Sequence, residues 1–185
     1  FSMRRLVSEI TDSVRFHAER KSIEIHMEYP EDVSDFVIGD HQRIRQILSN
    51  LVGNAVKFTN EGSVRVKVSE KREGDENDTL LTISVVDTGI GIEKEEADRL
   101  FAPFGQANQT IAGRFGGTGL GLVISKNLSD AMGGTITLES EPGKGSTFHF
   151  SLSLLRSQSD AVVEEENAEV FATNLEKFPT VPPKR

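Results

Sequence analysis

Two hydrophobic periods alternate along the chain and predict two kinds of secondary structure. Apolar and polar residues alternate in SVRVKVS, LTISVVD, TITLES and TFHFSLSL, which are residues 63–69, 81–87, 135–140 and 147–154. A weaker alternation covers SIEIHME, residues 22–28. Because successive side chains of a strand point to opposite faces of a sheet, each segment is expected to be a strand with one buried and one wet side.

Other segments repeat their apolar residues at helical spacing. Asp40 is a candidate N-cap for a helix whose buried stripe comprises Ile44, Ile47, Leu48, Leu51, Val52 and Ala55. A second helix is expected from about Gly119 to Gly133–Gly134, with a stripe of Leu120, Val123, Ile124, Leu128, Ala131 and Met132. Further helices are expected at residues 3–20 and in the short segment KEEADRLF, residues 94–101.

These elements together predict the α/β class. Helices with one apolar stripe and strands with one polar face pack as a two-layer α/β sandwich. We expect a mixed, mostly antiparallel sheet of about five strands, covered on one face by about three helices.

Length and composition limit the classes of function. The 185 residues suit one domain, residues 1–155, followed by an acidic and then Pro-rich linker, residues 156–185. A net charge of −8 argues against a nucleic-acid partner. The apolar runs are too short to span a bilayer and cysteine is absent. A cytoplasmic domain without membrane contact is expected, whether or not its parent protein is membrane-anchored. Because the first residue is Phe1, we expect a piece of a longer protein.

The helix from Asp40 carries a polar ridge. Asn50, Asn54 and Lys57 lie at positions i, i+4 and i+7 and therefore share one face, opposite the apolar stripe. Amide oxygens suit Mg²⁺, which takes part of its coordination shell from substrate phosphates, and a lysine can neutralise a phosphate. The alternative is an ordinary solvated helix face.

A second candidate lies in VVDTGIGI, residues 85–92. Asp87 ends a predicted strand and is followed by Gly89 and Gly91. A carboxylate there can accept hydrogen bonds from a ligand amine, while the glycines permit a close approach of the backbone. The alternative is a strand-to-helix turn that needs its glycines for geometry alone.

The stretch from Phe104 to Thr118 lacks a period and is rich in small and polar residues, which favours a mobile lid. Gln106 and Arg114 are its polar groups that could reach a terminal phosphate. The glycines of GGTGLGL, residues 116–122, then precede a helix, a setting that suits phosphate. They match neither the Walker A nor the dinucleotide-binding pattern.

Taken in order, these stretches resemble the ATP-binding catalytic domain of sensor histidine kinases, within the wider family shared with gyrase, Hsp90 chaperones and MutL (the GHKL or Bergerat fold). NLVGNAVKF is similar to the N box, DTGIGI to the first glycine box, LFAPF to the F box, GGTGLGL to the second glycine box and GKGSTF to the third. The likeness covers roughly residues 1–155. The lid sequence is similar to that of hybrid kinases, in which a receiver domain or response regulator is the next partner.

The resemblance implies ATP and Mg²⁺ as cofactors and a role for each motif. Asp87 would read the adenine amino group, with Gly89, Gly91 and Thr147 nearby and Phe58 and Ile92 beside the base. Asn54 would hold Mg²⁺ with support from Asn50, and Lys57 would touch phosphate. The triphosphate would be wrapped by Gly117, Thr118, Gly119, Leu120, Gly121 and Leu122.

One position separates this chain from the ATPases of the wider family. Those relatives carry a glutamate at the place of Asn50 to activate water, and an amide cannot take a proton from water at neutral pH. The resemblance therefore implies transfer to a histidine on a separate dimerisation and phosphotransfer domain, because none of His17, His26, His41 and His149 lies in the acceptor motif. An ATPase or molecular clamp, and a nucleotide-sensing module without transfer, stay as alternatives.

Overall fold

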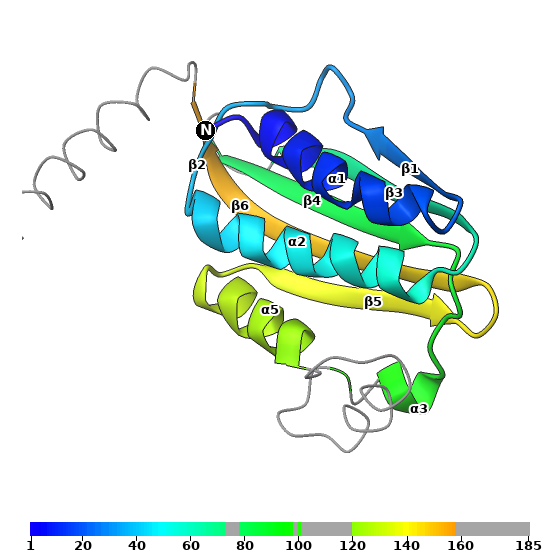
Figure 1. Ribbon diagram of the computed structural model, residues 1–185. Helices are drawn as coiled ribbons and strands as arrows, with labels where there is room; N and C mark the ends of the chain where they lie inside the picture. The colour runs from blue at the N-terminus through cyan, green and yellow to red at the C-terminus, as the bar shows by residue number, and fades with distance from the viewer. Residues whose placement is uncertain (73–77, 98–99, 101–119, 158–185) are drawn as a thin grey trace, which may run out of the picture.

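The computed structural model describes residues 1–72, 78–97, 100 and 120–157. In these residues a sheet forms one layer and helices cover one of its faces (Figure 1). The elements are α1 (Met3–Glu19), β1 (Ile23–Glu28), β2 (Val37–Ile38), α2 (His41–Phe58), β3 (Gly62–Arg72), β4 (Asp78–Asp87), α3 (Lys94–Ala97), α5 (Leu120–Ala131), β5 (Thr135–Glu141) and β6 (Gly145–Arg156). The predicted α/β sandwich is confirmed.

The described strands form one sheet in the order β1-β3-β4-β6-β2, and β5 also pairs with β6. Only the β1–β3 pair is parallel among the described strands. The expectation of about five strands missed β2, because a strand of two residues shows no alternation.

The core lies between the sheet and α2. The predicted stripe of α2 is buried throughout, and it faces Val64, Val66, Leu81, Ile83, Val85, Phe148 and Phe150 from β3, β4 and β6. Asp40 caps the helix as predicted, since its carboxylate accepts the backbone N–H of Arg43 at 3.0 Å. The cap fixes the first turn of α2, and the buried stripe holds the rest of the helix against β3, β4 and β6.

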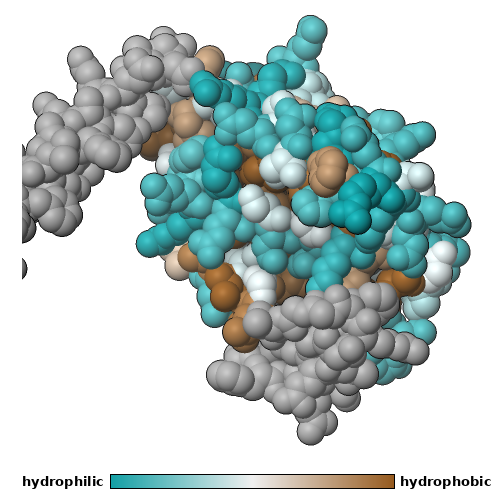
Figure 2. Space-filling model, in the orientation of Figure 1, coloured by the Kyte–Doolittle hydropathy of each residue, from teal (hydrophilic) through white to brown (hydrophobic). Residues whose placement is uncertain are grey.

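The predicted apolar stripe of α5 is wrong in its first turns and right at its end. Leu120 and Ile124 are 47% and 43% exposed, and hydrophobic side chains gather on the surface over this helix (Figure 2). The face that packs inward instead carries Gly121, Ser125 and Ser129. Small residues at four-residue spacing allow a close approach to α2, and that approach decides which face turns inward. Leu128 and Met132 do pack against the core, as expected.

The face of the sheet opposite the helices is polar. Thr82 and Ser151 share a hydrogen bond of 2.8 Å across β4 and β6, and so do the Ser84 hydroxyl and His149 Nδ1. The alternation along β1 puts His26 on this same face. No described helix is both long and apolar enough to cross a bilayer.

Candidate functional site

Asp87 lies at the end of β4, on the helix-covered side of the sheet, and is only 6% exposed. Its Oδ1 accepts the backbone N–H of Gly89 at 2.8 Å, and the backbone N–H of Ser146, its neighbour on β6, also donates to the carboxyl group. Burial raises the pKa of Asp87, and these two hydrogen bonds oppose that rise. Among the described residues, backbone N–H groups hold this buried carboxyl group and no charged side chain pairs with it.

The chain that follows Asp87 passes between the end of α2 and the β5–β6 turn. The N–H of Ile90 donates to the Phe58 carbonyl at 3.3 Å, and the N–H of Gly143 donates to the Ile90 carbonyl at 2.8 Å. The N–H of Ile92 donates to Ser140 Oγ at 2.8 Å. This loop is therefore tied to both of its neighbours by hydrogen bonds.

Two predicted glycines are needed by contacts within the protein. A Cβ on Gly89 would lie 2.5 Å from the Phe58 carbonyl oxygen. Gly91 has a φ of +68°, and a Cβ there would overlap the carbonyl of Glu141. The sequence indicated that these glycines allow a close approach of the backbone to a ligand. In the structure, each of them allows the close approach of another backbone segment of the same protein.

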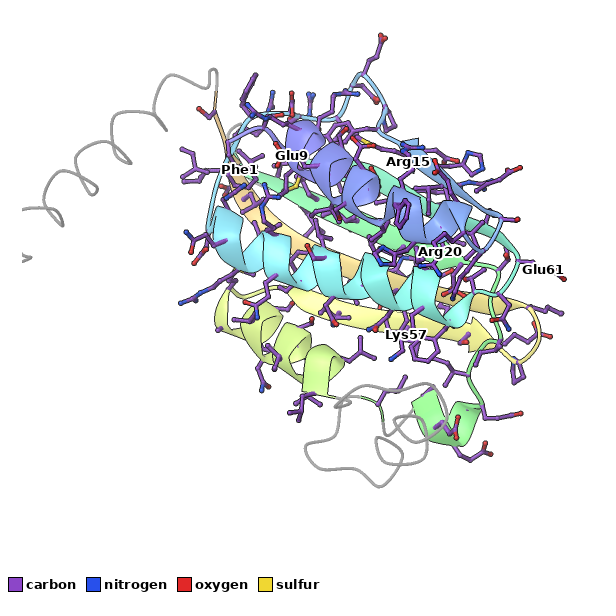
Figure 3. All side chains as sticks on the ribbon, viewed as in Figure 1. Phe1, Glu9, Arg15, Arg20, Lys57 and Glu61 are labelled. Carbon is purple, nitrogen blue, oxygen red and sulfur yellow. The ribbon has the colours of Figure 1, made fainter. Side chains whose placement is uncertain are left out.

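The polar ridge of α2 forms as predicted. Asn50 Nδ2 donates to the Ser125 hydroxyl on α5 at 2.9 Å, and Asn54 Nδ2 contacts Asn50 Oδ1 at 3.5 Å. Figure 3 shows Lys57 at the C-terminal end of the same helix, and its ammonium lies 5.1 Å from the centre of the Phe58 ring. Asn50 thus joins the two helices, and the amide of Asn54 contacts that of Asn50 through its nitrogen.

The first turn of α5 lies against this ridge. A Cβ on Gly121 would overlap Oδ1 of Asn50, so a larger residue there would require the Asn50 amide to move. Leu122 is half-buried against the core, whereas Leu120 is exposed. The N-terminal half of α5 and Asn50 of α2 therefore lie side by side.

Thr147 does not join this group. The register pairs Thr147 with Val86 and Ser146 with Asp87, and adjacent residues of a strand point to opposite faces. The side chain of Thr147 therefore lies on the open face of the sheet. Ser146 takes the place expected for Thr147, and its hydroxyl is 2.9 Å from that of Ser140.

Phe58 and Ile92, expected beside the base, are half-buried, Phe58 at the end of α2 and Ile92 in the loop after Asp87. The expected lid, residues 104–117, lies outside the described residues, as do Gln106, Arg114, Gly117, Thr118 and Gly119. Their predicted contacts with phosphate stay predictions.

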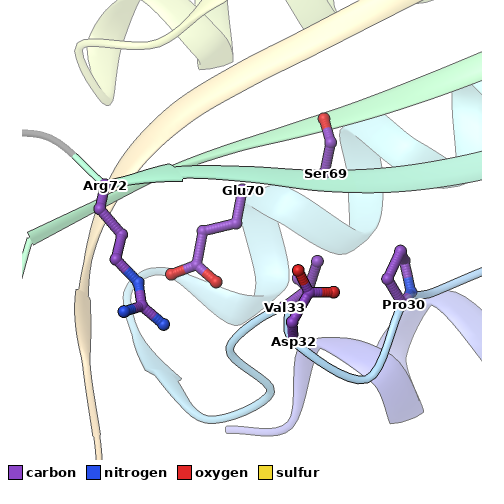
Figure 4. Close-up of a pocket in the computed structure, with 6 residues that line it drawn as sticks. All are labelled: Pro30, Asp32, Val33, Ser69, Glu70 and Arg72. Atoms are coloured by element: carbon purple, nitrogen blue, oxygen red, sulfur yellow. The ribbon is translucent and has the colours of Figure 1, made fainter.

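A surface hollow of about 360 Å³ lies elsewhere (Figure 4). Its lining includes Glu70, which is six residues along β3 from the partner of Asp87, or roughly 20 Å. Burial opposes ionisation of Glu70, but hydrogen bonds from Thr79 and Ser34 hold the pKa of this carboxyl group below its ordinary value. Glu70 of β3 thus links Thr79 of β4 to Ser34 in the loop after β1 by hydrogen bonds.

Sequence reasoning missed Ser125, Ser140, Ser146 and Lys21. The Lys21 ammonium donates to the carbonyls of Val56, Lys57 and Thr59 at 2.9, 2.8 and 3.0 Å. The sequence did indicate Ser125, because small residues at Gly121 and Ser125, one helical turn apart, are typical of a helix that packs closely against another. A lysine that binds carbonyls 35–38 residues away leaves no such signal.

Residues 39–156 match the family described as histidine kinase-, DNA gyrase B-, and HSP90-like ATPase. The chain is 42% identical over 154 residues to the signal transduction histidine-protein kinase BarA of Escherichia coli K12, which covers 83% of this chain and 17% of BarA. It is 40% identical over 161 residues to the sensor histidine kinase GacS of Pseudomonas protegens, which covers 87% and 17%.

Solved structures of histidine kinases are also similar to this chain. Full-length ShkA in complex with AMPPNP matches with a TM-score of 0.70 and 31% identity, over 86% of this chain and 31% of ShkA. The catalytic domain of the histidine kinase ThkA matches with a TM-score of 0.61 and 26% identity, over 82% of this chain and 93% of that one.

The chain belongs to the family of histidine kinase-, DNA gyrase B- and HSP90-like ATPases. Within that family it is a catalytic domain of the histidine kinase type, as the five sequence motifs indicated. It spans 17% of the length of each curated relative named here.

Proposed function

We propose that this domain binds Mg²⁺-ATP beside Asp87 and donates the γ-phosphoryl group to a histidine on a separate domain of the same protein. The observation that carries the proposal is the buried carboxyl group of Asp87, whose loop is bound to the last turn of α2, the helix whose amides contact the start of α5. The match to ShkA, whose structure contains AMPPNP, supports an adenine nucleotide as the ligand.

Asp87 selects adenine by its hydrogen-bonding character. An ionised carboxylate only accepts hydrogen bonds, so it suits the exocyclic amino group of adenine and repels the carbonyl oxygen that guanine carries at the same position. Phe58, at the end of α2, and Ile92, in the loop that follows, supply apolar surface. Ser146, rather than Thr147, is the hydroxyl residue next to Asp87.

The amides of α2 are suited to the metal and the phosphates. The oxygen of Asn54 is a hard ligand of the kind that Mg²⁺ accepts, and the bound ion would neutralise phosphate charge. Lys57, at the end of the same ridge, adds a positive charge. Leu120, Gly121 and Leu122 begin α5, whose N-terminal end favours an anion.

Asn50 favours transfer to a protein acceptor over hydrolysis. Its amide is not a base, and its nitrogen already donates to Ser125. Water near the γ-phosphate therefore finds no general base at this position, which disfavours the ATPase alternative.

The histidines of this chain are poorly placed as acceptors. His26 and His149 lie on the open face of the sheet, opposite the face that carries Asp87. His41 is at the N-terminal end of α2, sixteen residues or roughly 24 Å from Lys57. His17 is exposed near the end of α1. The proposed acceptor therefore belongs to a separate dimerisation and phosphotransfer domain, with a receiver domain or response regulator next in the relay.

Titration with ATP and with GTP tests the nucleotide assignment. We expect ATP to bind at least about tenfold more tightly, because guanine leaves the buried carboxylate without a donor. Isothermal calorimetry at neutral pH in the presence of Mg²⁺ measures both dissociation constants. Equal affinities would remove Asp87 from the base site.

Asn54→Ala tests the metal assignment. We expect it to weaken ATP binding roughly tenfold with Mg²⁺ present and by less than about twofold in EDTA, because the lost oxygen acts through the ion. Gln46→Ala is a matched control, since Gln46 is exposed on the same helix. The same loss for Asn54→Ala in both buffers would show that Asn54 does not hold Mg²⁺.

A further inference from the structure

We propose that Lys21 is a positioning residue for the nucleotide site, although it lies in the turn between α1 and β1. The inference rests on the proposed nucleotide site beside Asp87. Its basis is that one ammonium group binds the last turn of α2, the turn to which the loop after Asp87 is also bound.

The C-terminal carbonyls of a helix lack partners within the helix, and here each of those from Ala55 to Thr59 has a partner. Ala55 accepts the N–H and the hydroxyl of Thr59, at 3.1 and 2.7 Å. The carbonyls of Val56, Lys57 and Thr59 accept from Lys21. The remaining carbonyl, that of Phe58, accepts the N–H of Ile90. Lys21 therefore holds the residues on both sides of the Phe58 carbonyl.

The loop after Asp87 depends on that carbonyl being in place. Ile90 is bound to it, and Gly89 packs so closely against it that no Cβ would fit. The Asp87 carboxylate is in turn held by the N–H of Gly89. Displacement of the last turn of α2 would therefore move Gly89 and Ile90, and with them the orientation of the Asp87 carboxyl group.

A positive charge is the right group for this position. Three carbonyl oxygens at the C-terminal end of a helix carry the negative end of its dipole, and an ammonium group has three donors to offer them. Lys21 reaches these oxygens from the turn after α1, in which the next residue, Ser22, has a left-handed φ of 56°. Without the ammonium, the last turn has water as its partner and frays more readily.

Chemical rescue can test the ammonium group itself, because the chain contains no cysteine. Lys21→Cys introduces a single thiol at an exposed position. Alkylation with 2-bromoethylamine rebuilds a lysine analogue, whereas alkylation with 1-iodopropane gives a neutral side chain of the same length. Affinity for ADP is measured by calorimetry, and amide hydrogen exchange of Ile90 by NMR.

The propyl form is expected to bind ADP roughly fivefold more weakly than the unmodified protein, which corresponds to about 1 kcal/mol. It should also exchange the Ile90 amide at least about tenfold faster. The aminoethyl form should restore both values to within about twofold. Glu70→Gln is the control for a general loss of stability. It weakens the hydrogen bonds from Ser34 and Thr79, at the end of β3 away from Asp87, and should leave ADP affinity unchanged.

Equal ADP affinity of the propyl and aminoethyl forms would overturn the inference, and so would the same loss in Glu70→Gln. If the unmodified domain does not bind ADP, the proposed function fails by itself. The exchange of the Ile90 amide then still decides the role of Lys21, since unchanged exchange in the propyl form would overturn it.

Discussion

Asp87→Asn is expected to weaken ATP binding by about 2–3 kcal/mol, roughly 30- to 150-fold, while the empty domain keeps its stability. The amide oxygen can still accept from the backbone N–H groups of Gly89 and Ser146. The amide nitrogen then faces the adenine amino group, donor against donor. Calorimetry gives the affinity, and thermal unfolding gives the stability.

Asp87→Asn should lower the affinity for ATP without lowering the melting temperature of the empty domain. Burial raises the pKa of Asp87, so the folded protein binds this proton more tightly than the unfolded chain does. Between the ordinary and the raised pKa the stability of the empty domain therefore falls as pH rises, and an ionised Asp87 costs stability at neutral pH. Asp87→Asn removes that cost, so its melting temperature should be equal to that of the wild type or higher.

Asp87→Ala is the matched variant, because it loses the backbone hydrogen bonds as well as the charge. It should lower both ATP affinity and stability. ATP binding by the wild type should also weaken as pH falls through the raised pKa of Asp87, since a protonated carboxyl group is a poorer acceptor. An Asp87→Asn variant that binds ATP normally, or that unfolds more readily, would contradict this account of the site.

Much of the fold follows from local patterns in the sequence. The stripe of α2 and its cap at Asp40 were predictable, because one face of this long helix is apolar at every turn. The order of the strands was not predictable in the same way. The parallel pairing of β1 with β3 depends on where α2 returns the chain, and alternation within a strand carries no information about its neighbour.

Packing decided the features that local pattern could not. The inward face of α5 carries Gly121, Ser125 and Ser129, because close approach to α2 favours small side chains over the larger Leu120 and Ile124. A hydropathy pattern predicts that Leu120 and Ile124 are buried and that the serines are exposed, so it selects the wrong face of the helix.

The candidate site was predictable as motifs, but its details depend on register. Asp87 and the amides of α2 lie where the sequence indicated. Ser146, and not Thr147, points to the face that carries Asp87, because a shift of one residue along a strand reverses the face to which the side chain points. Lys21 acts on carbonyls that only the folded chain brings within its reach.

The second large effect concerns the acceptor. We expect the isolated domain to bind Mg²⁺-ATP without labelling itself, and a separate phosphoacceptor domain from the same full-length protein to raise phosphoryl transfer on the order of a hundredfold or more. Positioning a nucleophile in line with the γ-phosphate supplies much of the rate of such reactions. None of the histidines of this chain is so placed, and Asn50 provides no base for water.

Incubation with γ-labelled ATP, with and without that phosphoacceptor domain, tests the proposed transfer most directly. Acid treatment of the products identifies phosphohistidine, which is acid-labile, and release of inorganic phosphate is followed in parallel. The account predicts acid-labile label on the added domain only when both proteins are present, and little phosphate release from the catalytic domain alone. Acid-labile label on the isolated domain, or rapid phosphate release without the partner, would contradict it.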